Sequence, residues 1–163
     1  MDYIEQGSEL NWAVFGEKLA LLHQMEGKYF GLDHNNYIGS LEQINQECGG
    51  WSEFYTNHRL IALTAKARDQ GLFEKKHCNW VEKLCQRLDE LIPACRPSLI
   101  HGDLWSGNLL IDTSGHPVLI DPAVYYGHPE MDWAMLSLFG SYPVEALDPV
   151  SYTHLRAHET CVH

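Results

Sequence analysis

The sequence predicts a mainly α-helical domain that carries one small β hairpin. Apolar residues recur at three- and four-residue steps in three stretches, which cover residues 11–25, 51–69 and 74–91. Two short runs, 108–111 and 117–120, are rich in leucine, isoleucine or valine, and the turn-forming sequence Asp-Thr-Ser-Gly lies between them. The chain has 163 residues, of which 45% are apolar, and this is enough for one domain with its own core.

The charge and the cysteines restrict the partners and the compartment. The formal net charge is −11 at pH 7, which argues against nucleic acid and against an anionic membrane surface as partners. No apolar run is long enough to span a membrane and the acidic N-terminus is unlike a signal peptide, so we expect a cytoplasmic protein. The cysteines lack a repeating spacing, which is typical of free thiols: Cys48, Cys78, Cys85, Cys95 and Cys161.

The first helix is expected to begin near Ser8 or Asn11, because either residue is a suitable N-cap. Its apolar stripe consists of Trp12, Phe15, Leu19, Leu22 and Met25. His23 lies beside that stripe, and we expect a hydrogen-bonded polar side chain there rather than a metal ligand. Residues 26–50 are rich in glycine and asparagine, so they are expected to form an exposed, turn-rich connection.

Three further helices are expected after that connection. The second helix has Phe54, Ile61, Ala62 and Ala65 on its apolar face, and Arg59 is expected to be solvated or ion-paired. The third ends before Pro93, and its apolar stripe is Trp80, Val81, Leu84, Cys85, Leu88, Leu91 and Ile92. Cys78 and Cys85 are expected to be small core residues. A fourth helix opens at Pro129 and Glu130 and continues through Phe139.

Between the third and fourth helices lies the sequence His-Gly-Asp-Leu-Trp-Ser-Gly-Asn at 101–108, followed after the hairpin by Ile-Asp-Pro at 120–122. Protein kinases use this spacing, because phosphoryl transfer needs positioned charges and a proton acceptor rather than a covalent intermediate. In that interpretation Asp103 accepts the proton of the attacking hydroxyl. Asn108 and Asp121 then provide oxygen ligands to Mg²⁺ on the phosphates.

The hairpin supports this interpretation, because antiparallel pairing brings Asn108 and Asp121 to the same end of the ribbon. Gly102 and Gly107 allow the backbone conformations that such a loop needs. The other interpretation is that Asp103 caps a turn and Asp121 merely precedes a proline bend. The complete set of residues in this order favours the kinase interpretation.

Four segments carry a resemblance to a known family: HGDLWSGN at 101–108, IDPAVYYGHPEMDWAM at 120–135, FGLDHNNYIG at 30–39 and WSEFY at 51–55. Together they resemble the fructosamine (ketosamine) kinases, within the aminoglycoside and choline phosphotransferase branch of the protein-kinase-like fold. Aminoglycoside kinases more often have His-Pro in place of Trp-Ser within the first segment. The resemblance extends from the first residues to about Gly140.

The resemblance implies a division of the chain. Residues 9–150 would form part of the C-terminal (large) lobe of a protein-kinase-like fold, with the N-terminal lobe absent and the C-terminus truncated. Residues 1–8 would be a hinge remnant in which Tyr3 and Ile4 meet the adenine of ATP, and the other interpretation is a frayed terminus. Residues 151–163 do not resemble the family, and we interpret them as an unrelated or disordered tail or an artefactual extension.

The resemblance also implies roles for residues around the motif. His101 and Asp132 would be structural supports of the catalytic loop, Asp132 by accepting hydrogen bonds from its backbone. Asn36, Tyr37 and Trp105 would contact the sugar. The first two fit a plain surface connection equally well, and the Trp105 ring fits equally well as packing beneath the loop.

The activity that the resemblance implies is ATP-dependent phosphoryl transfer to a sugar hydroxyl of a ketosamine, with ATP and Mg²⁺ as cofactors. The ketosamine would be carried by a small molecule or a protein, and its phosphorylation would destabilise the adduct and deglycate the amine. The alternatives are a small-molecule kinase of the aminoglycoside or choline type and a non-catalytic lone lobe. The 163-residue chain by itself is expected to be inactive, and its sequence does not indicate an oligomeric state.

Overall fold

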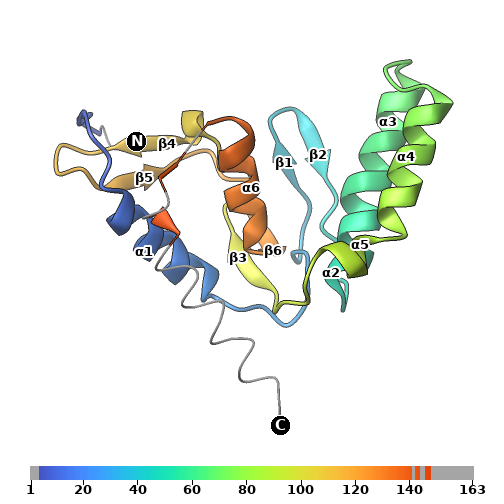
Figure 1. The fold of residues 1–163 in the computed structure, drawn as a ribbon, viewed down its shortest axis with the longest axis horizontal. Helices are drawn as coiled ribbons and strands as arrows, with labels where there is room; N and C mark the ends of the chain where they lie inside the picture. The colour runs from blue at the N-terminus through green and yellow to red at the C-terminus, as the bar shows by residue number, and fades with distance from the viewer. Residues whose placement is uncertain (1–3, 141, 144–145, 148–163) are drawn as a thin grey trace, which may run out of the picture.

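The computed structural model describes residues 4–140, 142–143 and 146–147. In this part of the chain, helices alternate with short strands (Figure 1). The helices are α1 (Trp12–His23), α2 (Trp51–Tyr55), the π-helix η1 (Thr56–Ile61), α3 (Ala62–Asp69), α4 (Lys75–Cys85), α5 (Leu88–Leu91), the 3₁₀ turn η2 (Ser106–Asn108) and α6 (Glu130–Leu138). The strands are β1 (Asn36–Ile38), β2 (Leu41–Gln43), β3 (Ser98–Ile100), β4 (Leu109–Ile111), β5 (Pro117–Leu119) and β6 (Tyr125–Gly127).

The strands form three two-stranded antiparallel sheets within the described residues. In β4–β5, Leu109 lies opposite Leu119, and the hairpin predicted from the sequence is thereby confirmed. Strands β1 and β2 lie inside the connection that was expected to contain only turns, and β3 pairs with β6 from the far side of the motif. Three-residue strands are too short for an alternating pattern, so the sequence did not reveal these two sheets.

One hydrophobic cluster lies between α1 and α6. Asn11 caps α1 with its side chain, as predicted. The rings of Phe15 and Trp133 pack edge to face, with their centroids 5.7 Å apart. Met25 was expected on the buried stripe, but that prediction was wrong because α1 ends at His23 and leaves Met25 54% exposed.

The helix predicted over residues 51–69 is present, but its middle turn is a π-helix. A π-helical turn contains more residues than an α-helical turn, so it changes the phase of the helix that follows. Ile61, expected on the buried face, is 39% exposed for this reason. The sequence carried no signal for the π-helix, because the apolar spacing of this stretch was compatible with a regular helix.

A second hydrophobic cluster consists of Phe30, Trp51, Phe54, Ile100 and Tyr125, and Arg59 of this π-helix is buried beside it. Its guanidinium carbon lies 4.7 Å from the centre of the Phe54 ring and 4.3 Å from the centre of the Tyr125 ring. The ion pairs found among the described residues do not include Arg59, so the expectation of a solvated or ion-paired side chain was wrong. Burial lowers the pKa of Arg59, and the neighbouring Tyr125 opposes that shift.

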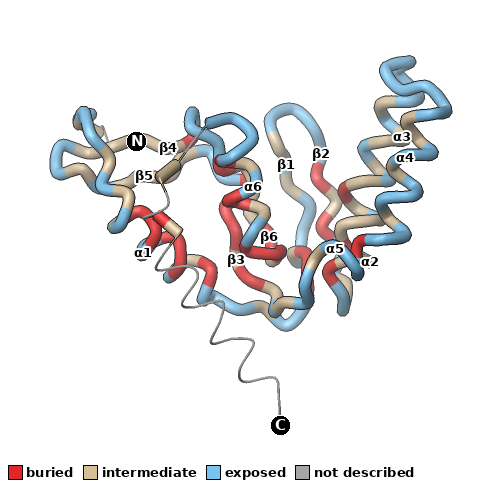
Figure 2. Tube along the Cα trace, in the orientation of Figure 1, coloured by how far each residue is buried: buried red, intermediate tan, exposed pale blue. Residues whose placement is uncertain are grey.

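The third predicted helix is divided into α4 and α5, and much of its apolar stripe faces solvent. Trp80 is 61% exposed, Leu84 41% and Leu91 51%, while Cys78 and Cys85 are half-buried rather than core residues. Figure 2 shows α3 and α4 with mostly exposed and intermediate surface. The buried stripe was wrongly predicted here because α4 packs mainly against α3 and η1, which cover only one of its sides.

The segment before α1 joins the β4–β5 hairpin. The N–H of Gly7 donates to the carbonyl of Ile111 at 2.9 Å, and Gln6 forms an isolated antiparallel bridge with Asp112. The later part of the predicted hinge remnant is therefore hydrogen-bonded to the hairpin. Tyr3 and the predicted tail at 151–163 lie outside the described residues.

The cysteines and the helix lengths can be compared with the sequence predictions over the whole described part of the chain. Its four cysteines, Cys48, Cys78, Cys85 and Cys95, are free thiols, as predicted. None of its helices has both the length and the apolar composition that a membrane span requires.

A matched pair of leucines tests where the core lies. Leu104 is fully buried in the cluster between α1 and α6, whereas Leu138 is 74% exposed. We expect Leu104→Ala to lower the free energy of unfolding by about 3 kcal/mol, because it leaves a cavity. Leu138→Ala should change it by less than about 0.5 kcal/mol. Urea denaturation followed by circular dichroism measures both, and equal losses would contradict this description of the core.

Candidate active site

The candidate site begins where β3 ends and the chain turns at Gly102. Gly102 has a φ of +80°, which favours glycine. A Cβ atom at this position would lie 2.2 Å from the carbonyl oxygen of Ala123, so a side chain would force the two segments apart. The loop at 101–108 can therefore lie close to the segment that follows Asp121 only because residue 102 is glycine.

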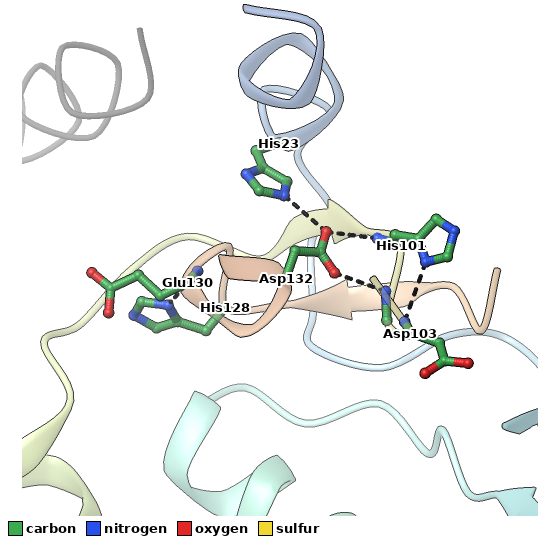
Figure 3. Close-up of polar contacts among 7 residues, drawn as sticks. His23, His101, Asp103, His128, Glu130 and Asp132 are labelled. Carbon is green, nitrogen blue, oxygen red and sulfur yellow. Dashed lines mark hydrogen bonds and ion pairs between the residues drawn. The ribbon is translucent and has the colours of Figure 1, made fainter. Parts of the chain in front are cut away.

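Asp132, in the first turn of α6, holds the same loop through its carboxylate (Figure 3). The backbone N–H groups of His101 and Gly102 donate to Oδ2 and Oδ1 of Asp132, each at 2.9 Å. The Oδ2 atom also lies 3.0 Å from Nε2 of His23, which comes from α1. Asp132 is 1% exposed and His23 is 4% exposed, so water does not compete for these bonds. The loop is thus fixed between two helices.

The imidazole of His101 connects the loop to the end of the hairpin. Its Nδ1 accepts the N–H of Asp103 at 3.3 Å, and its Nε2 lies 3.0 Å from the carbonyl oxygen of Ile120. A ring that accepts at one nitrogen and donates at the other is the neutral Nε2–H tautomer. His101 therefore contacts protein at both nitrogens. One contact is to the backbone of Asp103, and the other is to Ile120, the residue before Asp121.

Asn108 brings its side chain to Asp103. Its Nδ2 donates to the Asp103 carbonyl oxygen at 2.9 Å and to Oδ2 of the Asp103 carboxylate at 3.2 Å. The Asn108 residue is buried, and its backbone carbonyl accepts the N–H of Ile120 at 3.0 Å. With the amide nitrogen used in this way, the amide oxygen of Asn108 remains available as a ligand.

Asp121 follows the hairpin and is exposed. It has a φ of +51°, an uncommon value that aspartate tolerates better than most residues do. One backbone hydrogen bond on each side of Asp121 fixes its place. The N–H of Ile120 donates to the carbonyl of Asn108 at 3.0 Å, and the N–H of Ala123 donates to the carbonyl of His101 at 2.9 Å. The backbone beside Asp121 is therefore held next to the 101–108 loop, in which Asn108 contacts Asp103. Carboxylate and amide oxygens are the hard donors that Mg²⁺ prefers.

The aromatic residues expected near the sugar are both exposed. Trp105 is 41% exposed, and its ring lies over Gly107, where a Cβ atom would be 2.2 Å from the ring. The ring also packs edge to face with Phe139 at a centroid distance of 6.4 Å. Tyr37, on β1, is 64% exposed. One face of each ring is therefore accessible, and Trp105 packs against the loop at the same time.

Asn36, also expected near the sugar, makes its hydrogen bonds to protein groups. Its Nδ2 donates to the carbonyl oxygen of Val124 at 2.8 Å, and its Oδ1 accepts from Gln43 and Asn45. Ile4, expected at the adenine, is half-buried before the bridge that joins the first segment to the hairpin.

Sequence reasoning missed two parts of this arrangement. His23 is a hydrogen-bonded polar side chain, as expected, but its partner Asp132 was not foreseen, and the polar residues Gln43, Asn45 and Arg59 were not connected to the site. The histidine lies 109 residues from its partner in the chain, so no local pattern could have revealed the contact. A polar residue next to a buried apolar stripe was the one available signal.

The contacts of Asp132 lead to a test of the loop's support. Asp132→Asn replaces one accepting oxygen by a donor and leaves a buried N–H or His23 without its acceptor, so we expect a loss of about 3 kcal/mol in unfolding free energy. Asp33→Asn is the matched control, because the Asp33 side chain is 84% exposed. Urea denaturation measures both, and an Asp132→Asn protein as stable as the control would contradict the support assigned to this carboxylate.

Comparison with known proteins identifies the family. The model of the family described as fructosamine kinase matches residues 1–153. A protein of Lactiplantibacillus plantarum named "Probable ketoamine kinase" is 40% identical over 147 residues, which cover 89% of this chain and 52% of that protein. A chloroplastic protein-ribulosamine 3-kinase of Arabidopsis thaliana is 39% identical, and the match covers 83% of this chain and 43% of that protein.

A solved structure agrees with these matches. The crystal structure of a protein designated fructosamine-3-kinase from Thermobifida fusca aligns with a TM-score of 0.84 and 34% identity, over 97% of this chain and 55% of that one. The chain therefore spans about half the length of the relatives that it matches. By the family match over most of its length, the chain belongs to the fructosamine kinase family.

Proposed function

We propose that the protein containing this chain transfers the γ-phosphoryl group of ATP to a sugar hydroxyl of a ketosamine. The observation that carries the proposal is that hydrogen bonds of His101, Asn108 and Asp132 hold Asp103 and the backbone beside Asp121 in one loop region. These residue types suit phosphoryl transfer, in which catalysis consists mainly of positioning and of stabilising charge. The names of the relatives, ketoamine kinase and ribulosamine kinase, support the choice of substrate class.

Asp103 is the proposed base. Its carboxylate accepts the proton of the attacking sugar hydroxyl, and the hydrogen bond from Asn108 to its Oδ2 leaves the other oxygen free for that contact. The backbone of the loop does not need to rearrange, because Asp132 and Gly102 already hold it. We expect the proton acceptor to be preorganised in this way before the substrate binds.

Asn108 and Asp121 are the proposed ligands of Mg²⁺. The amide oxygen of Asn108 and the exposed carboxylate of Asp121 are hard oxygen donors, and they fit a cation that keeps several waters and binds phosphate oxygens. When bound, the cation supplies charge neutralisation on the phosphates of ATP. It also reduces the repulsion between those phosphates and a chain whose net charge is −11.

Tyr37 and Trp105 are the proposed contacts of the sugar. Their exposed rings offer flat apolar faces of the kind that pack against sugars, and Trp105 lies two residues after the base. Tyr3 and Ile4 are proposed to lie at the adenine. Phosphorylation of the ketosamine would then destabilise the adduct and release the amine, so the protein would act in deglycation of small molecules or proteins.

A survey of acceptors tests the proposed substrate class. The longest natural polypeptide containing these residues would be incubated with Mg·ATP and either fructosyl-lysine or an aminoglycoside. We expect a new phosphomonoester on the fructosyl group, observed by ³¹P NMR. Turnover of the aminoglycoside without turnover of fructosyl-lysine would reject the ketosamine in favour of a kinase of the aminoglycoside type.

Substitution of the proposed base is a second test. Asp103→Asn should lower kcat by roughly 10²–10⁴-fold, as expected for loss of a general base, while Asp112→Asn serves as a control in the hairpin turn.

The 163 residues alone are expected to be catalytically inactive. They contain no Gly-rich loop followed by a phosphate-binding lysine, so only a hinge segment and the metal ligands remain to hold the nucleotide. Isothermal titration calorimetry of the chain with Mg·ATP should therefore detect weak binding at most. A dissociation constant in the micromolar range would contradict this expectation and would show that these residues suffice for nucleotide binding.

A further inference from the structure

We propose that a polar network, formed by the half-buried Asn36 and the buried residues Gln43, Asn45 and Arg59, positions Asp121 as a metal ligand. The proposal rests on the metal role given to Asp121 under the proposed function. None of the four side chains needs to touch the metal, the nucleotide or the sugar. They act by fixing the carbonyl groups of Ala123 and Val124, which follow Asp121 in the chain.

The network reaches residues 121–124, here called the metal loop, at two adjacent points. Nε2 of Gln43 donates to the carbonyl oxygen of Ala123 at 3.2 Å, and Nδ2 of Asn36 donates to that of Val124 at 2.8 Å. Gln43 is 6% exposed, so its bonds are shielded from water. Both donors come from the β1–β2 hairpin, which lies 80 and 88 residues away in the sequence. The hairpin therefore fixes the segment that leaves Asp121.

The amide oxygen of Asn36 orients these donors. It accepts from Nε2 of Gln43 at 2.9 Å and from Nδ2 of Asn45 at 2.8 Å. Asn45 is fully buried, and its second amide hydrogen is directed to the carbonyl oxygen of His34 at 3.1 Å. With both bonds made, the Asn36 side chain can present only its nitrogen to Val124. The direction of the donor is thus set by its neighbours.

Arg59 anchors the far end of the network to the π-helix η1. Its Nη2 donates to Oδ1 of Asn45 at 2.8 Å, and its Nη1 donates to the carbonyl oxygen of Ile44 at 2.6 Å. The guanidinium is also held beside the rings of Phe54 and Tyr125. Tyr125 belongs to β6, the strand that begins soon after Asp121. Arg59 therefore contacts both the segment that follows the β1–β2 hairpin and strand β6, which comes after Asp121 in the chain.

The backbone conformation of Asp121 explains why this support is needed. Its φ of +51° is the one positive value at a non-glycine residue in the described part of the chain. Such a conformation persists when the surrounding structure determines it by several contacts. Before Asp121 the contact is made by Ile120, and after it by the Ala123 N–H and the two carbonyl groups that the network binds. Without the network, fewer contacts would hold the backbone beside Asp121, and its carboxylate would lose its fixed position.

This inference gives Asn36 a different role from the sugar contact expected from the sequence. Along a strand, neighbouring side chains point to opposite faces. Asn36 is directed at the metal loop, whereas Tyr37 next to it is 64% exposed and is the better placed of the two for a substrate. Asn36 is accordingly a positioning residue.

Titration of the 163-residue chain with Mn²⁺, followed by electron paramagnetic resonance, tests the proposal without relying on activity. Asn36→Ala and Gln43→Met each remove a donor to the metal loop, and we expect each to weaken Mn²⁺ binding by roughly 10-fold, as is usual for residues that orient metal ligands. The matched control is Asn35→Ala. Asn35 bonds the backbone N–H of Asn45 and the side chain of Glu42 in the same hairpin but does not contact the metal loop.

Urea denaturation of every variant separates positioning from simple destabilisation. The proposal predicts that Asn35→Ala lowers stability and leaves Mn²⁺ affinity unchanged, while the other two variants lower the affinity of the folded protein. If Asn36→Ala does not fold, the milder Gln43→Met decides. Asp121→Asn identifies the metal site itself.

Two results would overturn the inference. If Asp121→Asn weakens Mn²⁺ binding but both network variants bind as the unchanged chain does, the network does not position Asp121 and the proposed function stands. If Asp121→Asn has no effect on Mn²⁺ binding, Asp121 is not a metal ligand, and the metal role fails together with the role inferred for the network.

Discussion

The carboxylate of Asp132 accepts hydrogen bonds from two successive backbone N–H groups of the loop and from a histidine on another helix. Charged hydrogen bonds of this kind are stronger than neutral ones, and burial removes the competition from water. Because α6 contributes Asp132 and α1 contributes His23, the packing of these two helices determines where the loop lies. The edge-to-face contact of Phe15 with Trp133 holds the same two helices together. The core and the candidate site are therefore parts of one arrangement.

Short hydrogen-bonded connections link the loop held by Asp132 to the proposed catalytic residues. His101 bonds both Asp103, the proposed base, and the end of the hairpin, and Asn108 bonds Asp103 with its side chain and the hairpin with its backbone. The β4–β5 hairpin between Asn108 and Asp121 has strands of only three residues. A short, paired ribbon limits the relative movement of its two ends. Such preorganisation is what phosphoryl transfer requires of a protein.

What the sequence could predict was mainly local. The cap at Asn11, the β4–β5 hairpin and the spacing of the motif depend on residues close in the chain, and short-range patterns record them. The burial of Arg59 and the exposure of Trp80 depend instead on what packs against the helix from elsewhere. The partners of Asn36 lie up to 88 residues away, so its direction could not be foreseen. The motif residues were identified by their types and order, whereas the groups that hold them required the fold.

If Asn108 and Asp121 hold one cation beside Asp103, paramagnetic relaxation will locate that cation. Trace Mn²⁺ added to the ¹⁵N-labelled chain broadens the amide resonances of residues near the bound ion. We expect selective broadening at the loop 101–108 and at residues 120–123, and we expect it to disappear in Asp121→Asn. Broadening that is centred on the other acidic segments of the surface, or that is the same in Asp121→Asn, would contradict it.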